Sequence, residues 1–330
     1  SQAVLRFNQM AAQADSPALY CDSRLLLSLA TDTALQGETR ATSLVAAEDQ
    51  LVICWQGALY NLRELRAEES LGNAVDPDSD CALILLLYKK HGEDLANLLV
   101  GTFAIMIYDM TRQQLILIRD RFGVESLYYL TGDGYLAFSS TIPGVLRVSK
   151  QTAKLFHPAI GKILLFNYNP GLETLVAGVR RLAPAHILSQ PAEGKVNLQR
   201  YWELTFCQKK SSETEISRDL LAHLRQAVAS CIGNNPQVGI FLSGGMDSST
   251  VAALTRENRQ IEIDTFSYRC RAASFDESRY ARIMSEFVNS RHNESDYGHE
   301  HVLQMPEVVE GMNEPFCDVG INIATYLLGR

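Results

Sequence analysis

The sequence predicts a two-domain α/β protein, with a β-rich front domain at residues 1–207 and an α/β back domain at residues 208–330. A chain of 330 residues is long for a single domain. Short apolar runs rich in β-forming residues dominate the first part, whereas strand and helix patterns alternate in the second. Residues 208–213 are polar and unpatterned, which is typical of a linker, and they mark the boundary.

The front domain is expected to consist mainly of strands and hairpins, with two helical patches. The predicted strands cover residues 51–55, 103–108, 114–119, 126–130 and 135–139, and residues 131–134 form the hairpin turn before the last of them. The clearest helix covers residues 79–91, where Ser79 or Asp80 can cap its start and Gly92 ends it. Apolar runs this dense indicate sheets covered on both faces, as in a layered sandwich.

The back domain begins with a helix predicted at residues 215–231. Its apolar positions form one stripe: Ile216, Leu220, Leu221, Leu224 and Val228. After it, the pattern predicts a strand at 238–242, a helix at 248–257, a strand at 263–268 and a helix at 276–288. Strands that alternate with helices predict parallel strands in an open sheet.

Composition argues against several classes of function. A net charge of −8 and a pI near 5.4 argue against a nucleic-acid-binding surface, which needs a basic stripe. The best apolar run, residues 81–88, is far shorter than the ~20 residues of a membrane span, so no membrane partner is expected. Seven cysteines without a C-x-x-C pair are typical of reduced, mostly buried thiols in a cytoplasmic protein.

A candidate phosphate-binding loop lies between the strand at 238–242 and the helix at 248–257: Ser243, Gly244, Gly245, Met246, Asp247, Ser248 and Ser249. Two glycines let successive backbone N–H groups turn towards one point, and the helix amino terminus adds donors and a positive dipole end. The three serines supply hydroxyl donors, and the carboxylate can hold Mg²⁺ beside pyrophosphate. The loop lacks the lysine of G-x-x-x-x-G-K-[ST], which argues against a phosphoryl-transferring enzyme. A serine-capped glycine turn is the alternative interpretation.

The loop resembles the S-G-G-[LMV]-D-S-S loop of the N-type ATP pyrophosphatases, which turn ATP into AMP and pyrophosphate. Other segments resemble the asparagine synthetase family, in the same order and at similar spacing. In the front domain they lie at residues 56–61, 79–81, 101–104, 119–129, 178–182 and 200–202 (QGALYN, SDC, GTFA, RDRFGVESLYY, GVRRL and RYW). In the back domain they lie at residues 275–278, 314–318 and 325–328 (FDES, EPFCD and TYLL).

The resemblance implies a front domain of the class II glutamine amidotransferase type, an Ntn-hydrolase-like αββα sandwich of two sheets between helices. It implies a back domain of the synthetase type, in which ATP adenylates a carboxylate and an amine then displaces AMP. ATP and Mg²⁺ are therefore the expected cofactors. Ser243 and Asp247 are the expected catalytic residues, with Asp247 as the magnesium ligand, and the backbone near Phe241 and Tyr268 is expected to frame the adenine.

The glutamine site departs from the family pattern. The family needs an amino-terminal cysteine, because its own α-amine activates the thiol, whereas residue 1 is Ser1. A nucleophilic Ser1, and a Ser1 left by cleavage or cloning, are both open. The family element Arg-Gly-Pro-Asp reads Asp-Ser-Pro-Ala at residues 15–18, and Arg24 is an ambiguous candidate for the arginine that holds the carboxylate of glutamine.

The expected oxyanion element, Asn-Gly-Glu in the family, reads Gln56, Gly57 and Ala58. Asp80, which in the family grips the amine of the substrate, is retained, and a plain helix cap is the alternative role for it. The resemblance thus implies a vestigial glutamine site at Gln56, Gly57 and Asp80, with glutaminase activity lost or incomplete.

A second difference concerns the far end of the sequence. The family places another loop, rich in glycine and acidic residues, shortly after the segment that resembles residues 314–330. The sequence ends at Arg330, before that loop. The chain is therefore expected to be a fragment or to need a companion chain, and by itself to bind ATP weakly without turnover. A homodimer is the other association left open.

The sequence leaves three functions open. The leading one is an AMP-forming amide ligase with an inactive glutaminase site. Loss of glutaminase residues from a retained scaffold resembles the β-lactam and lasso-peptide macrolactam synthetases, in which the attacking amine belongs to the small-molecule or peptide substrate. The second is a glutamine-hydrolysing asparagine synthetase whose amino-terminal cysteine and carboxyl-terminal half lie outside this chain. The third is a non-catalytic nucleotide-binding or scaffold protein, against which the intact loop argues.

Overall fold

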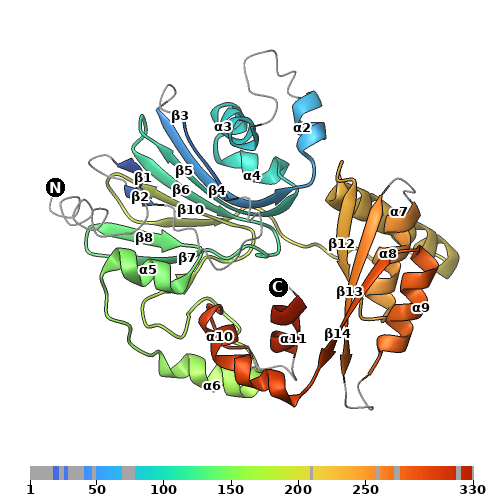
Figure 1. Cartoon of the computed structure of the whole chain (residues 1–330). Helices are drawn as coiled ribbons and strands as arrows, with labels where there is room; N and C mark the ends of the chain where they lie inside the picture. Colours follow the sequence, from blue (N-terminus) through green and yellow to red (C-terminus); the bar gives the residue numbers. More distant parts are fainter. Residues whose placement is uncertain are drawn as a thin grey trace. The chain divides into compact units, whose positions relative to one another are not determined.

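The computed structural model describes residues 18–21, 26–28, 41–46, 50–68, 79–208, 211–257, 261–270, 276–316 and 321–328. The chain divides into two compact units, Ser1–Thr205 and Phe206–Arg330 (Figure 1). The predictions that concern Ser1, Arg24 and residues 15–17 lie outside the described residues. No helix in the described part of the chain is long and apolar enough to cross a membrane.

A six-stranded antiparallel sheet, in the order β11-β10-β6-β5-β4-β3, is the centre of the first unit (Figure 1). Its strands are β3 (Ala41–Ala46), β4 (Leu51–Leu59), β5 (Gly101–Asp109), β6 (Gln114–Arg119), β10 (His186–Pro191) and β11 (Asn197–Arg200). A second sheet has the order β8-β7-β9, and β1 pairs with β2. These strands are β1 (Ala18–Cys21), β2 (Leu26–Ser28), β7 (Tyr128–Gly132), β8 (Tyr135–Ser139) and β9 (Arg180–Arg181).

Buried side chains show how the layers of the first unit are stacked. The described helices are α2 (Leu62–Glu68), α3 (Asp80–His91), the 3-10 helix η2 (Gly92–Asp94), α4 (Leu95–Leu98), α5 (Ile142–Ser149) and α6 (His157–Phe166). Ile53 and Ile105 of the large sheet pack with Leu83 of α3 in one cluster. On the other face of that sheet, Leu117 packs with Tyr129 of the small sheet. A third cluster joins the small sheet to α5, so the layers follow the order helix, sheet, sheet, helix.

The predicted helix at 79–91 is confirmed as α3, because Ser79 accepts a hydrogen bond from Ala82 N at 3.2 Å and Gly92 is its C-cap. The expectation of two helical patches is wrong, since α5 and α6 also form. Each carries a proline in its first turn, where the missing N–H removes no intrahelical hydrogen bond. The strand predicted at 126–130 begins two residues later, at Tyr128.

The second unit contains a parallel sheet in the order β12-β13-β14. Its strands are β12 (Gln237–Phe241), β13 (Glu262–Cys270) and β14 (Arg291–Tyr297). The described helices are α7 (Glu213–Ile232), α8 (Met246–Glu257), α9 (Ser278–Val288), the 3-10 helix η4 (His299–Gln304), α10 (Met305–Glu310) and α11 (Ile321–Leu328). Ile240, Ala252 and Ala281 belong to one buried cluster, which joins the sheet to α8 and α9.

Several sequence expectations for the second unit need correction. The predicted apolar stripe of α7 is only partly covered: Ile216 and Leu220 are more than half exposed, whereas Leu224 and Val228 are half-buried. Strand β14 was not predicted, since its sequence, RHNESDY, is polar throughout. Helix α8 begins at Met246 and not at 248, which places Asp247 in its first turn. In both units, the expectation of mostly buried cysteines does not hold for the four cysteines whose burial the structure describes, Cys54, Cys81, Cys207 and Cys231, because Cys81 alone is buried.

Candidate functional site

The candidate phosphate loop leads from the carboxyl end of β12 into α8, at the edge of a parallel sheet where ligands of such folds usually bind. Leu242 N donates to Phe266 O at 2.8 Å, which extends the ladder one residue past β12. Ser249 N donates to Gly245 O at 3.1 Å, the first helical bond of α8. The N–H groups of Met246, Asp247 and Ser248 precede that bond, so the helix itself does not satisfy them.

Gly244 adopts a conformation that a side chain would prevent. Its φ angle is +84°, in the region that favours glycine. A Cβ atom at this position would lie 2.5 Å from Ala281 N and 2.7 Å from Tyr280 Cβ. The loop therefore passes directly against α9, and glycine is required by both the dihedral angle and the available space.

Two serine hydroxyls hold the shape of the loop. Ser243 Oγ accepts a hydrogen bond from Gly245 N at 3.2 Å and lies 3.0 Å from Ser248 Oγ. Ser248 Oγ accepts from Ser243 N at 3.3 Å and donates to Gly245 O at 3.3 Å. The proton of Ser243 can turn to a phosphate oxygen without disturbing the bond from Gly245.

The groups around the start of α8 fit a magnesium–pyrophosphate ligand. Backbone N–H groups and the positive end of the helix dipole attract an anion, and a hydrogen bond to a charged group contributes about 1.5–3 kcal/mol. Asp247 is exposed in the same turn. A carboxylate beside a phosphate repels it, whereas a divalent cation between the two is bound by both. The donor set therefore fits a phosphate together with Mg²⁺ better than a phosphate alone.

The residues predicted to frame the adenine, Phe241 and Tyr268, lie towards the carboxyl ends of β12 and β13. Phe241 ends β12, is 56% exposed and contacts Phe266 edge to face at 6.4 Å between ring centroids. Tyr268 lies two residues beyond Phe266 on β13, and burial raises the pKa of its hydroxyl to about 12. Phe241 therefore presents an exposed ring at the carboxyl end of its strand, whereas the hydroxyl of Tyr268 is buried.

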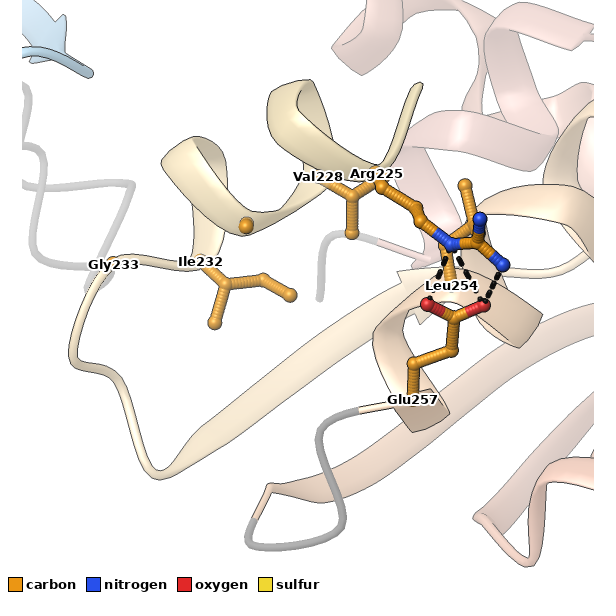
Figure 2. A pocket seen from close by; sticks show the side chains of 7 residues that line it. Arg225, Val228, Ile232, Gly233, Leu254 and Glu257 are labelled. Atoms are coloured by element: carbon orange, nitrogen blue, oxygen red, sulfur yellow. Dashed lines mark hydrogen bonds and ion pairs between the residues drawn. The ribbon is translucent and has the colours of Figure 1, made fainter. Parts of the chain in front are cut away.

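A groove of about 260 Å³ lies elsewhere in this unit, between α7 and α8 (Figure 2). It is lined by Arg225, Val228, Ala229, Ile232, Gly233, Leu254 and Glu257. Arg225 donates to Glu257 through Nε at 2.8 Å and Nη2 at 2.9 Å. No residue of the phosphate loop lines this groove, so it is separate from the candidate nucleotide site.

In the first unit, Gln56 and Asp80 of the predicted vestigial glutamine site each form a side-chain hydrogen bond with another residue of the chain. Gln56 and Gly57 lie within β4, where Gly57 has a φ of +121° and a Cβ there would lie 2.0 Å from Thr102 O. The side-chain amide of Gln56 donates to Glu125 Oε2 at 2.8 Å. Asp80 Oδ1 accepts from Arg66 Nη2 at 3.1 Å, and the capping role belongs to Ser79.

Sequence reasoning missed Glu125 and Arg66. Both backbone groups of Glu125 are fixed by the preceding turn: its N–H donates to Asp120 Oδ2 at 3.0 Å, and its carbonyl accepts from Arg119 Nε at 2.7 Å. This anchoring directs the Glu125 side chain to Gln56. Glu125 lies in the segment 119–129 that carries the family resemblance, but no spacing rule connects it with residue 56.

The turn at Arg119 and Asp120 is held by hydrogen bonds between both side chains and backbone groups. Asp120 is buried and accepts four backbone N–H groups, from Phe103 at 3.3 Å and from Phe122, Val124 and Glu125 at 3.0 Å. Burial lowers the pKa of Arg119, which donates to the carbonyl oxygens of three other residues: Glu125, Gly123 and Leu182. These hydrogen bonds of both side chains thus go to backbone groups.

Comparisons with known proteins agree with the two-unit organisation. Residues 11–202 match the glutamine amidotransferase domain family, and residues 219–330 match the asparagine synthase family. Glutamine-hydrolyzing asparagine synthetase 1 of Bacillus subtilis is 24% identical, over 96% of this chain and 50% of its own length. A putative glutamine-hydrolyzing asparagine synthetase of Mycobacterium tuberculosis is 30% identical, over 82% of this chain and 43% of its own.

Amidase chyE of Penicillium rubens is 32% identical, over 54% of this chain and 27% of its own length. The chain spans about half the length of the Bacillus relative and less of the other two. The two domain families occur in one order along the chain and together cover most of it. The chain therefore belongs to the asparagine synthetase family.

Proposed function

We propose that this chain belongs to an ATP-dependent carbon–nitrogen ligase that forms AMP and pyrophosphate while it joins a carboxylate to an amine. The observation that carries the proposal is the loop from Ser243 to Ser249, with Gly244 pressed against α9 and three backbone N–H groups at the start of α8. This arrangement supports binding of the pyrophosphate part of ATP. The back unit is proposed to be the synthetase domain, and the front unit a degenerate Ntn-like domain.

The proposed chemistry follows from what the loop can stabilise. A carboxylate resists attack by an amine until one of its oxygens becomes part of a good leaving group, which AMP provides. The N–H groups of Met246, Asp247 and Ser248 would bind the negative charge that develops on the departing pyrophosphate. Asp247 would hold Mg²⁺, which neutralises that charge when bound. Ser243 would orient the phosphates through its hydroxyl.

The glutaminase site is proposed to be inactive. A glutamine site needs polar groups that are available to the substrate, but the amide of Gln56 is bonded to Glu125 and the carboxylate of Asp80 to Arg66. Each contact already uses part of the hydrogen-bonding capacity that glutamine would need from these two side chains. The amine is therefore proposed to come from the second substrate, as in lactam-forming relatives, and not from glutamine.

A glutamine-hydrolysing asparagine synthetase is the second candidate, and the names of two relatives favour it. The two functions differ in their use of glutamine. A single experiment separates them: incubation of the natural gene product with MgATP, aspartate and either glutamine or ammonium chloride, with products followed by phosphorus-31 NMR and glutamate release.

Release of glutamate coupled to AMP formation would establish the second candidate. AMP and pyrophosphate formed with ammonium chloride but not with glutamine, and without glutamate release, would support an inactive glutaminase site, as the first candidate requires. Formation of ADP and phosphate in place of AMP would contradict both, because the loop would then serve a different cleavage of ATP. The Asp247→Asn variant serves as the control that should abolish AMP formation.

A further inference from the structure

The first turn of α9 packs directly against the phosphate loop at Gly244. The closest approaches to a Cβ on Gly244 come from Ala281 N and Tyr280 Cβ, at 2.5 and 2.7 Å. No change of side-chain rotamer moves these atoms away. The path of the loop therefore depends on where α9 lies.

An ion pair next to this contact fixes α9 to the sheet. Arg282 follows Ala281 and donates to Glu294 of β14 through Nε at 2.8 Å and Nη2 at 2.6 Å. A two-point contact sets both the distance and the angle between helix and strand. The side chain of Glu294 is 20% exposed and that of Arg282 is 46% exposed, so the pair is only partly open to solvent.

A second set of polar contacts links α9 to the sheet at Ser285, about one helical turn after Arg282. His292, on the same face of β14 as Glu294, lies 2.9 Å from Thr265 Oγ1 through Nδ1 and 3.2 Å from Ser267 Oγ through Nε2. Ser290 Oγ lies 2.8 Å from Thr265 Oγ1 and 2.9 Å from Ser285 Oγ of α9. The helix is thus held to β13 and β14 at two points, Arg282 and Ser285.

We propose that Arg282 and Glu294 are positioning residues for the phosphate loop: their ion pair holds the first turn of α9 where Ala281 supports Gly244. Neither residue is proposed to touch ATP. The inference rests on the proposed function only for its ligand-binding readout, because the support of the loop by α9 exists without a ligand.

The first test needs no nucleotide. The Glu294→Gln variant removes the negative charge of Glu294 and keeps the size of its side chain. Amide hydrogen exchange in peptides that cover residues 243–249 should become faster, because the loop loses its fixed support. The matched control is Glu257→Gln, which breaks a similar two-point pair with Arg225 at the far end of α8 (Figure 2) and should leave that exchange unchanged.

The second test measures binding of MgATP to the same proteins by equilibrium dialysis. Glu294→Gln should weaken binding by about fivefold or more, whereas Glu257→Gln should match the unchanged chain. If Glu294→Gln does not fold, Arg282→Lys replaces it, since lysine keeps the charge but loses the two-point fork.

The outcomes separate the two ideas. Equal hydrogen exchange of residues 243–249 in Glu294→Gln and in the unchanged chain would overturn the positioning role. The same holds if Glu294→Gln and Glu257→Gln change this exchange to the same extent. Failure of the unchanged chain to bind MgATP, together with faster loop exchange in Glu294→Gln, would overturn the proposed function and leave the positioning role in place.

Discussion

The side-chain amide of Gln56 donates a hydrogen bond of 2.8 Å to the carboxylate of Glu125, 69 residues further along the chain. Because the backbone of Glu125 is anchored by Arg119 and Asp120, its carboxylate is held within reach of the Gln56 amide. A double-mutant cycle of Gln56→Ala and Glu125→Ala should give a coupling of about 1 kcal/mol in the free energy of unfolding. Additive effects of the two changes would show that the pair contributes nothing, and would remove one of the two contacts that argue against glutamine binding.

Gly244 and Gly245 are adjacent but should respond differently to alanine. Gly244→Ala puts a Cβ into backbone atoms of α9 and forces an unfavourable φ, whereas a Cβ on Gly245 meets only Ser243 Oγ, at 3.3 Å. The dihedral alone costs about 1–2 kcal/mol, and the clash adds to it. Thermal unfolding should therefore show a large loss of stability for Gly244→Ala and a small one for Gly245→Ala. Equal melting temperatures would contradict the close packing of the loop on α9.

Asp120 should be among the least replaceable residues of the first unit. Each of its oxygens accepts two backbone N–H groups, so Asp120→Asn turns an NH₂ group towards two donors. The expected loss in the free energy of unfolding is about 3 kcal/mol, measured by denaturant titration. Asp133→Asn, the same change at an exposed position, should stay close to the unchanged protein. A similar loss in both variants would contradict the role given to the Asp120 turn.

His292 makes stability depend on pH. Burial lowers its pKa, with Arg282 acting in the same direction and Glu294 against it. The unfolded chain, with a histidine pKa of about 6.5, therefore takes up the proton first as the pH falls. The contribution of neutral His292 is complete above about pH 6.5 and is lost as the pH falls towards the folded-state pKa.

This pH effect can be isolated with His292→Gln, which removes the titrating group. The difference in free energy of unfolding between the two proteins should shrink between about pH 8 and about pH 5. Other titrating groups are shared by both proteins and cancel. A difference that stays constant or grows as the pH falls would contradict burial of a neutral imidazole.

The phosphate loop was predictable from the sequence because its geometry follows from local residue types. Glycine at 244 and a helix that follows the loop require only backbone conformation and hydrogen bonds within a few residues, although the helix begins at Met246, two residues before the predicted start. Helix α3 was predictable for the same reason, since Ser79 caps it locally. The use of these residues in binding ATP stays a prediction.

Features that depend on distant partners were not predictable. Strand β14 is polar because its residues contact β13 and α9, as Glu294 does with Arg282, and no alternation of apolar residues marks it. The Gln56–Glu125 and Arg66–Asp80 pairs join separate segments, so a residue-by-residue comparison with a family motif does not find them. Conversely, the stripe of α7 is apolar in sequence, but its first part, with Ile216 and Leu220, is exposed, since an amphipathic pattern does not state what covers a helix.

The most direct test of the proposed ATP chemistry is the magnesium dependence of ATP binding, measured by equilibrium dialysis on the unchanged chain and on Asp247→Asn. Without Mg²⁺, the unchanged chain should bind ATP poorly, because Asp247 repels the phosphates, and Asp247→Asn should bind it at least as well. With Mg²⁺, binding to the unchanged chain should strengthen by about tenfold, whereas binding to Asp247→Asn should hardly change. Magnesium dependence that is equal in the two proteins, or no binding of ATP by either, would contradict the assignment of this loop as the magnesium–pyrophosphate site.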